Sequence, residues 1–176
     1  MKRELTLTDI AGYLPHNLKM IFHDGDIWGI DATLGEVDYD NRLLPLFHFT
    51  SMKAILRPMS DLYVEITEQE YNDGKPFVPI MELANLLGDA DSMRWEFQPE
   101  NSRVFSREYS WCFQWDFECR AFMLPDSPSE YVLGHIMPYA HKLYDLLHRL
   151  HLDYRGLIDE GPAISVHDLP TNPYEL

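Results

Sequence analysis

The chain has 176 residues, of which 45% are hydrophobic and 24% charged, and it carries a formal net charge of −15 at pH 7. This length fits one domain, and the apolar content is sufficient for a core, which argues against a wholly disordered protein. A surface with such an excess of carboxylates repels phosphate backbones and anionic lipid, so direct binding to nucleic acid or to a membrane is not expected.

The predicted elements of the N-terminal part are a short helix and a hairpin. Thr8 can cap a helix near 8–14, with Asp9 favourably placed at its positive end. The stretch "LKMIF" (18–22) is predicted as a strand, and "IWGIDATLG" (27–35) as its partner across a turn. The apolar and aromatic segment 44–51 is predicted as a further strand.

The middle of the chain predicts an extended segment followed by a helix. Residues before Pro58 are expected to be extended, because proline disfavours helix at the preceding residue, and Ser60 can then cap a short helix. "VPIMELANLLG" predicts a helix at 79–88, with proline in its first turn and glycine as its stop. Leu83, Leu86 and Leu87 supply its apolar stripe.

Two segments alternate between apolar and polar residues, as the strands of a half-buried antiparallel sheet do. The first is "MRWEFQ" (93–98), and the second runs from Tyr109 to Ala121, where every odd position is apolar. An aromatic row can also stack on nucleic-acid bases, but only one basic residue, Arg120, accompanies this row, so core packing is favoured. Because the second segment exceeds the usual strand length, it is expected to bend or bulge.

The two cysteines bear on the cellular compartment. Cys112 and Cys119 are too few for a disulfide framework or a structural zinc site. Their odd separation would place them on opposite faces of one strand, so no bond between them is expected. The N-terminal sequence has no apolar signal-peptide core, and no apolar stretch approaches the ~18 residues of a membrane span. A reducing, cytoplasmic setting is therefore predicted.

The segment 129–152 predicts a long C-terminal helix with two distinct faces. On a helical wheel His141, Asp145 and His148 form one stripe, and His151 lies further round. The apolar residues cluster on the opposite side: Val132, Tyr139, Leu143, Leu146, Leu147 and Leu150. Since the apolar face is the buried one, the stripe is expected to face solvent.

Three interpretations of this histidine stripe remain open. It is the solvated face of the helix, a contact for a partner or second subunit, or a metal or catalytic site. Residues three or four apart on a helix are ~5–6 Å neighbours, a reach that suits metal ligands. A transition metal on an exposed face would need further ligands from another element. His141, Asp145 and His148 are therefore the candidate metal ligands.

Acidic residues are concentrated in the middle of the chain. Between residues 61 and 102 there are ten acids and two bases, a net −8. The acids are scattered and form no runs, which favours a solubilising role. The alternative is a surface that docks on a basic partner or acts as a decoy for a DNA-binding protein.

Four blocks, in this order, resemble a family of small uncharacterised proteins from Bacteroidetes genomes, prophages and gut phages. They are "LTLTDIAGYLPHNLKM", "ILRPMSDL", "DGKPFVPI" and "LHLDYRGLIDEGPAISVHDL", and they cover about half the chain. His151 and Asp153 match the family's C-terminal block, whereas Leu150 and Leu152 replace its aromatics and Pro162 departs from its pattern. The family has no assigned activity, so the resemblance implies a cytoplasmic, phage or mobile-element context and no role for any residue.

Together these observations predict a single α+β domain spanning 1–176. An antiparallel sheet would pack its aromatic face against the helix near 129–152, and residues 166–176 would form an extended tail over the surface. The predicted function is that of a non-catalytic acidic interaction protein of phage or prophage origin, with a protein partner and no cofactor. A metal-dependent enzyme using the histidine stripe is the alternative, and a homodimer is a further hypothesis.

Overall fold

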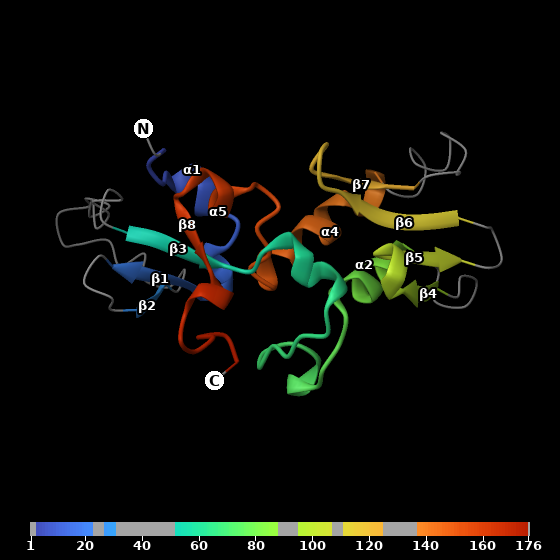
Figure 1. Ribbon diagram of the computed structural model, residues 1–176, viewed down its shortest axis with the longest axis horizontal. Coiled ribbons are helices and arrows are strands. Elements are labelled where there is room, and N and C mark those ends of the chain that lie inside the picture. The colour runs from blue at the N-terminus through green and yellow to red at the C-terminus, as the bar shows by residue number, and fades with distance from the viewer. Residues whose placement is uncertain are drawn as a thin grey trace. The chain divides into compact units, whose positions relative to one another are not determined.

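The computed structural model describes most of the chain as two compact units, each with its own sheet (Figure 1). The described residues are 3–22, 27–30, 52–87, 95–106, 111–124 and 137–175. The first unit comprises Met1–Met59 and Leu147–Tyr174, and the second comprises Ser60–Leu146. The fold is α+β, as predicted, although the strands lie in two four-stranded sheets and not in one. That residues 1–176 form one domain stays a prediction, because compactness does not show which parts fold together.

The sheet of the first unit is mixed, with the strand order β2-β1-β3-β8. Strand β1 (Leu18–Phe22) pairs antiparallel with β2 (Ile27–Ile30) and with β3 (Met52–Leu56), and β8 (Ala163–Ser165) runs parallel to β3. The predicted strand 18–22 and its hairpin partner are thus confirmed, while the predicted strand 44–51 lies outside the described residues.

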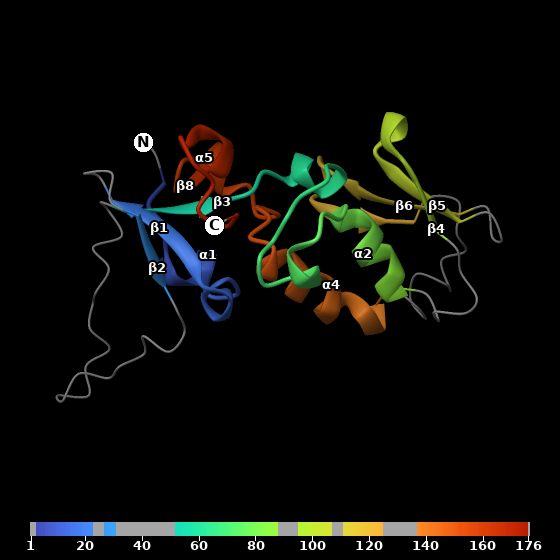
Figure 2. The ribbon, with the colours of Figure 1, turned by 90° about the horizontal axis from the view of Figure 1, so that it is seen from below.

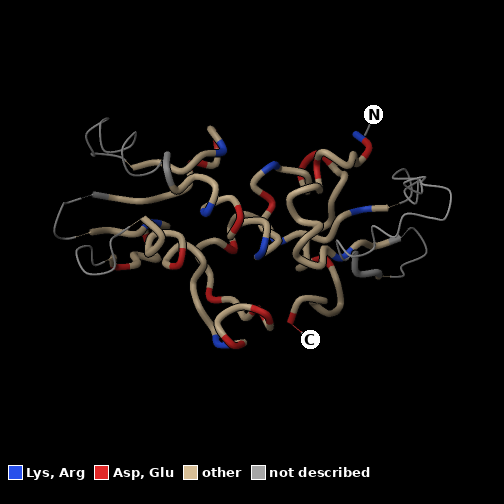
Figure 3. Tube along the Cα trace, turned by 180° about the vertical axis from the view of Figure 1, so that it is seen from behind, with Lys and Arg blue, Asp and Glu red and all other residues tan. Residues whose placement is uncertain are grey.

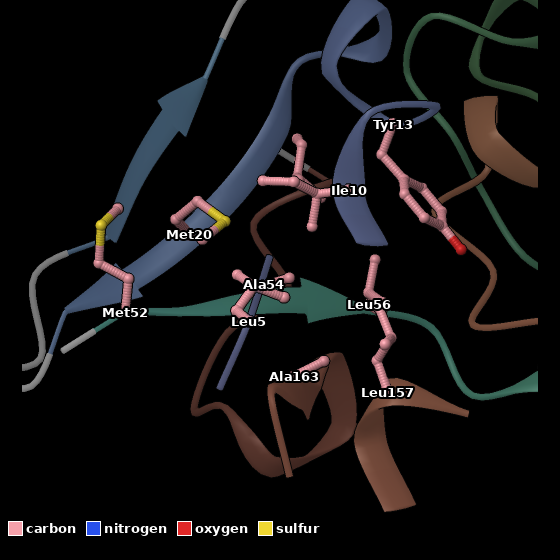
Figure 4. Packing of buried hydrophobic residues seen from close by; sticks show 10 residues of the cluster. Leu5, Ile10, Tyr13, Met20, Met52, Ala54, Leu56, Leu157 and Ala163 are labelled. Atoms are coloured by element: carbon pink, nitrogen blue, oxygen red, sulfur yellow. The ribbon is translucent and has the colours of Figure 1, made fainter. Parts of the chain in front are cut away.

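One face of this sheet carries the main core of the first unit (Figure 4). Alternate residues of β1 and β3, namely Leu18, Met20, Ala54 and Leu56, are fully buried there. They pack against α1 (Leu7–Ile10), the segment with the 3-10 turn η1 (Leu14–His16), and α5 (Leu157–Glu160); these elements contribute Ile10, Tyr13 and Leu157 to the core. The cap of α1 is Thr6 and not Thr8 as predicted: its N–H and hydroxyl both donate to the Asp9 carboxylate, at 2.9 and 2.6 Å.

The C-terminal tail covers the opposite face of the same sheet. After β8 the chain forms a 3-10 turn, η8 (Val166–Asp168), and Val166, Tyr174 and Ile55 of β3 make a second buried cluster. The tail was expected to run extended over the surface, but its Tyr174 is buried. Both the ring and the hydroxyl of Tyr174 contact the sheet. The hydroxyl accepts from Lys19 N at 3.0 Å and donates to Ile55 O at 2.8 Å.

The second unit contains an antiparallel sheet in the order β4-β5-β6-β7. Strand β4 (Trp95–Gln98) is joined to β5 (Arg103–Ser106) by the 3-10 turn η6 (Pro99–Asn101), and β6 (Trp111–Asp116) and β7 (Ala121–Met123) follow. The prediction of one strand over 109–121 is wrong, since the chain turns at 117–120 and returns as β7. The predicted aromatic core is confirmed at Phe113 and Trp115, which are buried, and Phe113 stacks on Phe122 with ring centroids 5.2 Å apart.

Helix α2 (Pro79–Leu87) confirms the predicted helix at 79–88 and lies beside β4 and β5 (Figure 2). Its buried side is formed by Ile80, Leu83, Ala84 and Leu87. Two 3-10 turns precede it, η4 (Met59–Tyr63) and η5 (Asn72–Gly74), and the first coincides with the short helix expected after Ser60.

Helix α4 (Met137–Arg149) is the described part of the predicted C-terminal helix. Its leucine face is buried as expected, at Leu143, Leu146 and Leu147, and Leu150 beyond its end is buried too. The helix stops earlier than the predicted residue 152, because His151 adopts a left-handed conformation with φ 56°. In the second unit, Tyr144 of α4 meets Phe122 of β7 edge-on, with ring centroids 6.3 Å apart.

Candidate functional site

The three residues of the predicted histidine stripe lie on α4 and differ in their exposure. His141 and Asp145 are exposed, as expected. His148 is half-buried, so the expectation of a solvent-facing side chain is wrong for this residue. Its imidazole packs edge-on against Tyr13, with ring centroids 4.8 Å apart, and lies so close to Gly12 that a Cβ there would be 2.3 Å from the ring. Any side chain at residue 12 would therefore have to displace the imidazole.

A tyrosine from beyond the helix end engages His148. The Tyr154 hydroxyl lies 2.9 Å from His148 Nε2 and 3.0 Å from Arg155 Nε. Since a guanidinium nitrogen can only donate, the hydroxyl accepts from Arg155 and its proton is available to Nε2. In either tautomer of His148, this hydrogen bond occupies Nε2.

Among the residues that the structure describes, no group of three or more His, Cys, Asp or Glu side chains could hold a metal ion. The metal-dependent alternative therefore gains no support from His148, and the metal site on His141, Asp145 and His148 stays a prediction.

His151 is the most deeply buried histidine of the described chain. It is 2% exposed, its Nε2 donates to His16 O at 2.7 Å, and its ring stacks on Tyr174 with centroids 3.9 Å apart. Burial, together with the positive charge of Arg57, lowers the pKa of His151 to about 3, against the opposing effect of the His16 carbonyl. The imidazole is therefore neutral at physiological pH.

Asp153, the second residue that matches the family block, holds the turn into α5. Its carboxylate accepts from Leu157 N at 2.9 Å and from Ile158 N at 2.8 Å. Burial raises the pKa of Asp153, and these backbone donors oppose the rise. Gly156, with φ 77°, supplies the left-handed residue that lets the chain enter the helix.

His151 and Asp153 also flank a backbone bridge between distant segments. Arg57 N donates to His151 O and Asp153 N donates to Arg57 O, both at 2.8 Å. The two matching residues thus build a buried corner that joins the end of β3 to α5. The family resemblance implied no role for His151 and Asp153, and in the structure both residues stabilise this corner of the fold.

The second unit carries an exposed apolar surface that the sequence did not reveal. Phe117 is 55% exposed and Val64 is 54% exposed, and the Phe117 ring contacts Tyr63, with centroids 6.3 Å apart. Val64 directly follows Tyr63 in the chain, and we call Tyr63, Val64 and Phe117 the Tyr63–Phe117 patch. Phe117 was expected in the core, because it continues the odd-numbered aromatic row. The available signal was Asp116, a residue typical of turns, at the point where the row ends.

Two bonding patterns hold this patch in place. The Tyr63 hydroxyl accepts from Trp115 N at 2.8 Å, which fixes η4 to the end of β6. Asp116 Oδ1 accepts from Glu118 N at 2.9 Å and from Cys119 N at 2.7 Å, which closes the turn that presents Phe117. The apolar side chains are therefore presented on an ordered part of the second unit.

No family model, curated protein or solved structure matches the chain. Among the helices that the structure describes, none is both long and apolar enough to cross a membrane. The function of the chain must therefore be inferred from its own residues.

Proposed function

We propose that the chain is a non-catalytic protein-interaction module of phage or prophage origin. The observation that carries the proposal is the Tyr63–Phe117 patch. Exposed large apolar side chains that lie together, here Val64 and Phe117 with Phe117 on a closed turn, are typical of anchors for a protein partner. The resemblance of four sequence blocks to phage and prophage proteins supports the stated origin.

The use of the ionisable groups in the first unit supports a non-catalytic role. Asp153 caps the turn into α5, and Asp9 accepts from Thr6 at the start of α1. His151 is stacked and sealed from solvent, so no substrate can reach its ring. Asp9, His151 and Asp153 thus each have a structural task.

The cysteines support a reducing compartment such as the cytoplasm. Both Cys112 and Cys119 are free thiols, and Cys119 is exposed in the turn after β6. An exposed thiol persists where the surroundings are reducing and is easily oxidised elsewhere.

The acids of residues 61–102 do not support the decoy variant of this proposal. Asp61 and Glu68 are buried, and the described acids come from η4, η5, α2, β4, η6 and the segments between them. Figure 3 shows the acidic residues of the second unit spread along the trace instead of gathered in one stretch. A DNA-like surface needs ordered rows of charge on one side, so we keep the proposal of a protein partner.

The test is capture of the partner by the full chain at native abundance in a host lysate. We expect a stoichiometric partner with the wild-type protein, and loss of that partner with Phe117→Ser. Leu7→Ser is the matched control, because Leu7 is 54% exposed but lies in the first unit. Recovery of the wild-type chain alone, or equal capture by both variants, would contradict the proposal. Light scattering on the same samples tests the homodimer hypothesis, in which the partner is a second copy.

A further inference from the structure

We infer that the partner docks on the Tyr63–Phe117 patch through a cationic polypeptide segment that carries an apolar anchor. This inference rests on the proposed function and adds the chemistry of the partner. It depends on the charged residues next to the patch. Two of these, Glu65 and Glu118, make no ion pair within the described chain.

In the sequence, acidic residues stand next to each exposed apolar residue of the patch. Glu65 follows Val64, and Asp116 and Glu118 stand on either side of Phe117. Glu65 and Glu118 are exposed, and neither carboxylate makes an ion pair within the part of the chain that the structure describes. Asp116 uses one carboxylate oxygen to close the turn. Within the described chain, the carboxylates of Glu65 and Glu118 are therefore available to a cation of a partner.

The basic residue nearest to Phe117 in the sequence, Arg120, does not make the net charge next to the patch positive. Arg120 lies in the same turn and is exposed, against three carboxylates at residues 65, 116 and 118. The chain as a whole carries −15. An approaching anionic segment would be repelled both by the whole surface and by the border of the patch, whereas a lysine- or arginine-bearing segment would be attracted.

Apolar contact and charge have different tasks in this arrangement. Burial of Phe117 and Val64 against an apolar side chain supplies most of the affinity, because removing apolar area from water stabilises a complex more than exposed charge pairs do. The carboxylates steer the segment and select its sign. Since the bonds of Tyr63 and Asp116 already order the Tyr63 side chain and the backbone of the turn, little of their freedom is lost on binding.

The experiment measures fluorescence anisotropy of labelled peptides with the full chain. The probe is a short amphipathic lysine–leucine peptide with one phenylalanine. A glutamate–leucine peptide of the same pattern and a lysine–serine peptide are the matched controls. We expect saturable binding of the lysine–leucine peptide alone, and weaker binding as salt is raised, because screening reduces the attraction.

Variants locate the binding on the patch. Phe117→Ser should weaken the Kd for the lysine–leucine peptide roughly tenfold, as removal of an anchor does. Glu65→Gln combined with Glu118→Gln should weaken it by about threefold and reduce its salt dependence. Leu7→Ser and Glu4→Gln, two exposed positions of the first unit, should leave it unchanged. Val64→Ser replaces Phe117→Ser if circular dichroism shows that the latter does not fold.

The outcomes separate this inference from the proposed function. The inference of a cationic segment would be wrong if the glutamate–leucine peptide bound as tightly as the lysine–leucine peptide. It would also be wrong if Phe117→Ser and the double glutamine variant both bound the lysine–leucine peptide with the Kd of the wild type. If capture of the host partner requires Phe117 while the lysine–leucine peptide fails to bind, the proposed function stands and the inference about its partner is wrong. If the peptide binds at the patch and no host partner is captured, the proposed function fails instead.

Discussion

At the scale of single residues, the clearest physical effect is the buried neutral imidazole of His151. Its pKa in the folded protein is about 3, below the ordinary 6.5, because burial disfavours the charged ring. Between these two values the unfolded chain binds the proton and the folded chain does not. The free energy of unfolding therefore falls as the pH drops through this window. The difference between the two pKa values corresponds to a loss of roughly 5 kcal/mol in the free energy of unfolding across the whole window, at 1.36 kcal/mol per pKa unit.

We predict that His151→Asn removes this pH dependence. Asparagine tolerates the left-handed backbone at residue 151 and does not titrate. The variant should be less stable than the wild type near neutral pH, because the stack on Tyr174 is lost, and the gap should narrow toward about pH 4. Urea unfolding across this range measures the gap. The opposite effect of Asp153, whose pKa is raised, is present in both proteins and cancels. A gap that does not change with pH would contradict the prediction.

The residues also show why a helical wheel misplaced His148 and gave no indication that His151 is buried. The wheel used the positions of His148 and His151 within one predicted helix. It could not include Tyr154, which engages His148 from beyond the helix end, or His16, which lies 135 residues from His151. In both cases the partner is remote or follows a left-handed turn, so a local pattern carries no signal for it.

At the scale of elements, the Tyr174 hydroxyl bridges the backbones of β1 and β3 at a position where the two strands are not directly paired. Strands β1 and β3 pair at Ile21 with Lys53 and at Met20 with Ala54. The register would next bring Lys19 opposite Ile55, and there the Tyr174 hydroxyl accepts from one backbone and donates to the other. The tail thus supplies a hydrogen bond that the strands do not make directly.

We predict that Tyr174→Phe destabilises the protein by about 1–3 kcal/mol, because two backbone groups lose their hydroxyl partner inside the fold. Thermal or urea unfolding measures this loss. Tyr71→Phe is the matched control: its hydroxyl bonds to Glu82 at 3.1 Å near the surface, and the change should cost about 0–1 kcal/mol. Equal losses in the two variants would show that the bridge between β1 and β3 adds nothing.

The hairpin of β6 and β7 shows the limit of alternation as a signal. Odd-numbered apolar residues continue from Trp111 to Ala121, as if in one strand. The carboxylate of Asp116 instead closes a turn, and Arg120 takes a positive φ of 50°. Phe117 keeps the parity of the core residues and is nevertheless exposed, because parity has no meaning once the chain leaves the sheet.

At the scale of the whole molecule, the chain passes between its two units twice. It crosses after Met59, and again within α4, whose residues up to Leu146 belong to the second unit and whose last three belong to the first. A helix unfolds cooperatively, because each turn depends on its neighbours. The loss of one unit is therefore expected to affect the other through α4.

We predict a single unfolding transition for the full chain, as the single-domain hypothesis requires. Three of the four tryptophans, Trp95, Trp111 and Trp115, belong to the second unit, so tryptophan fluorescence reports mainly on that unit. Far-UV circular dichroism reports on both units. The two signals should change at the same urea concentration. Separate midpoints would instead establish two domains.

The sequence by itself determined the elements whose formation depends on near neighbours. Strand β1 with its hairpin partner, helix α2 and the leucine face of α4 follow from periodicity, proline placement and turn residues, all of which act within a few positions. Only the tertiary structure decided the division into two sheets, the burial of His151 and Tyr174, and the exposure of Phe117. The physical reason is that these outcomes depend on contacts between segments far apart in the chain, whose free energy no local pattern records.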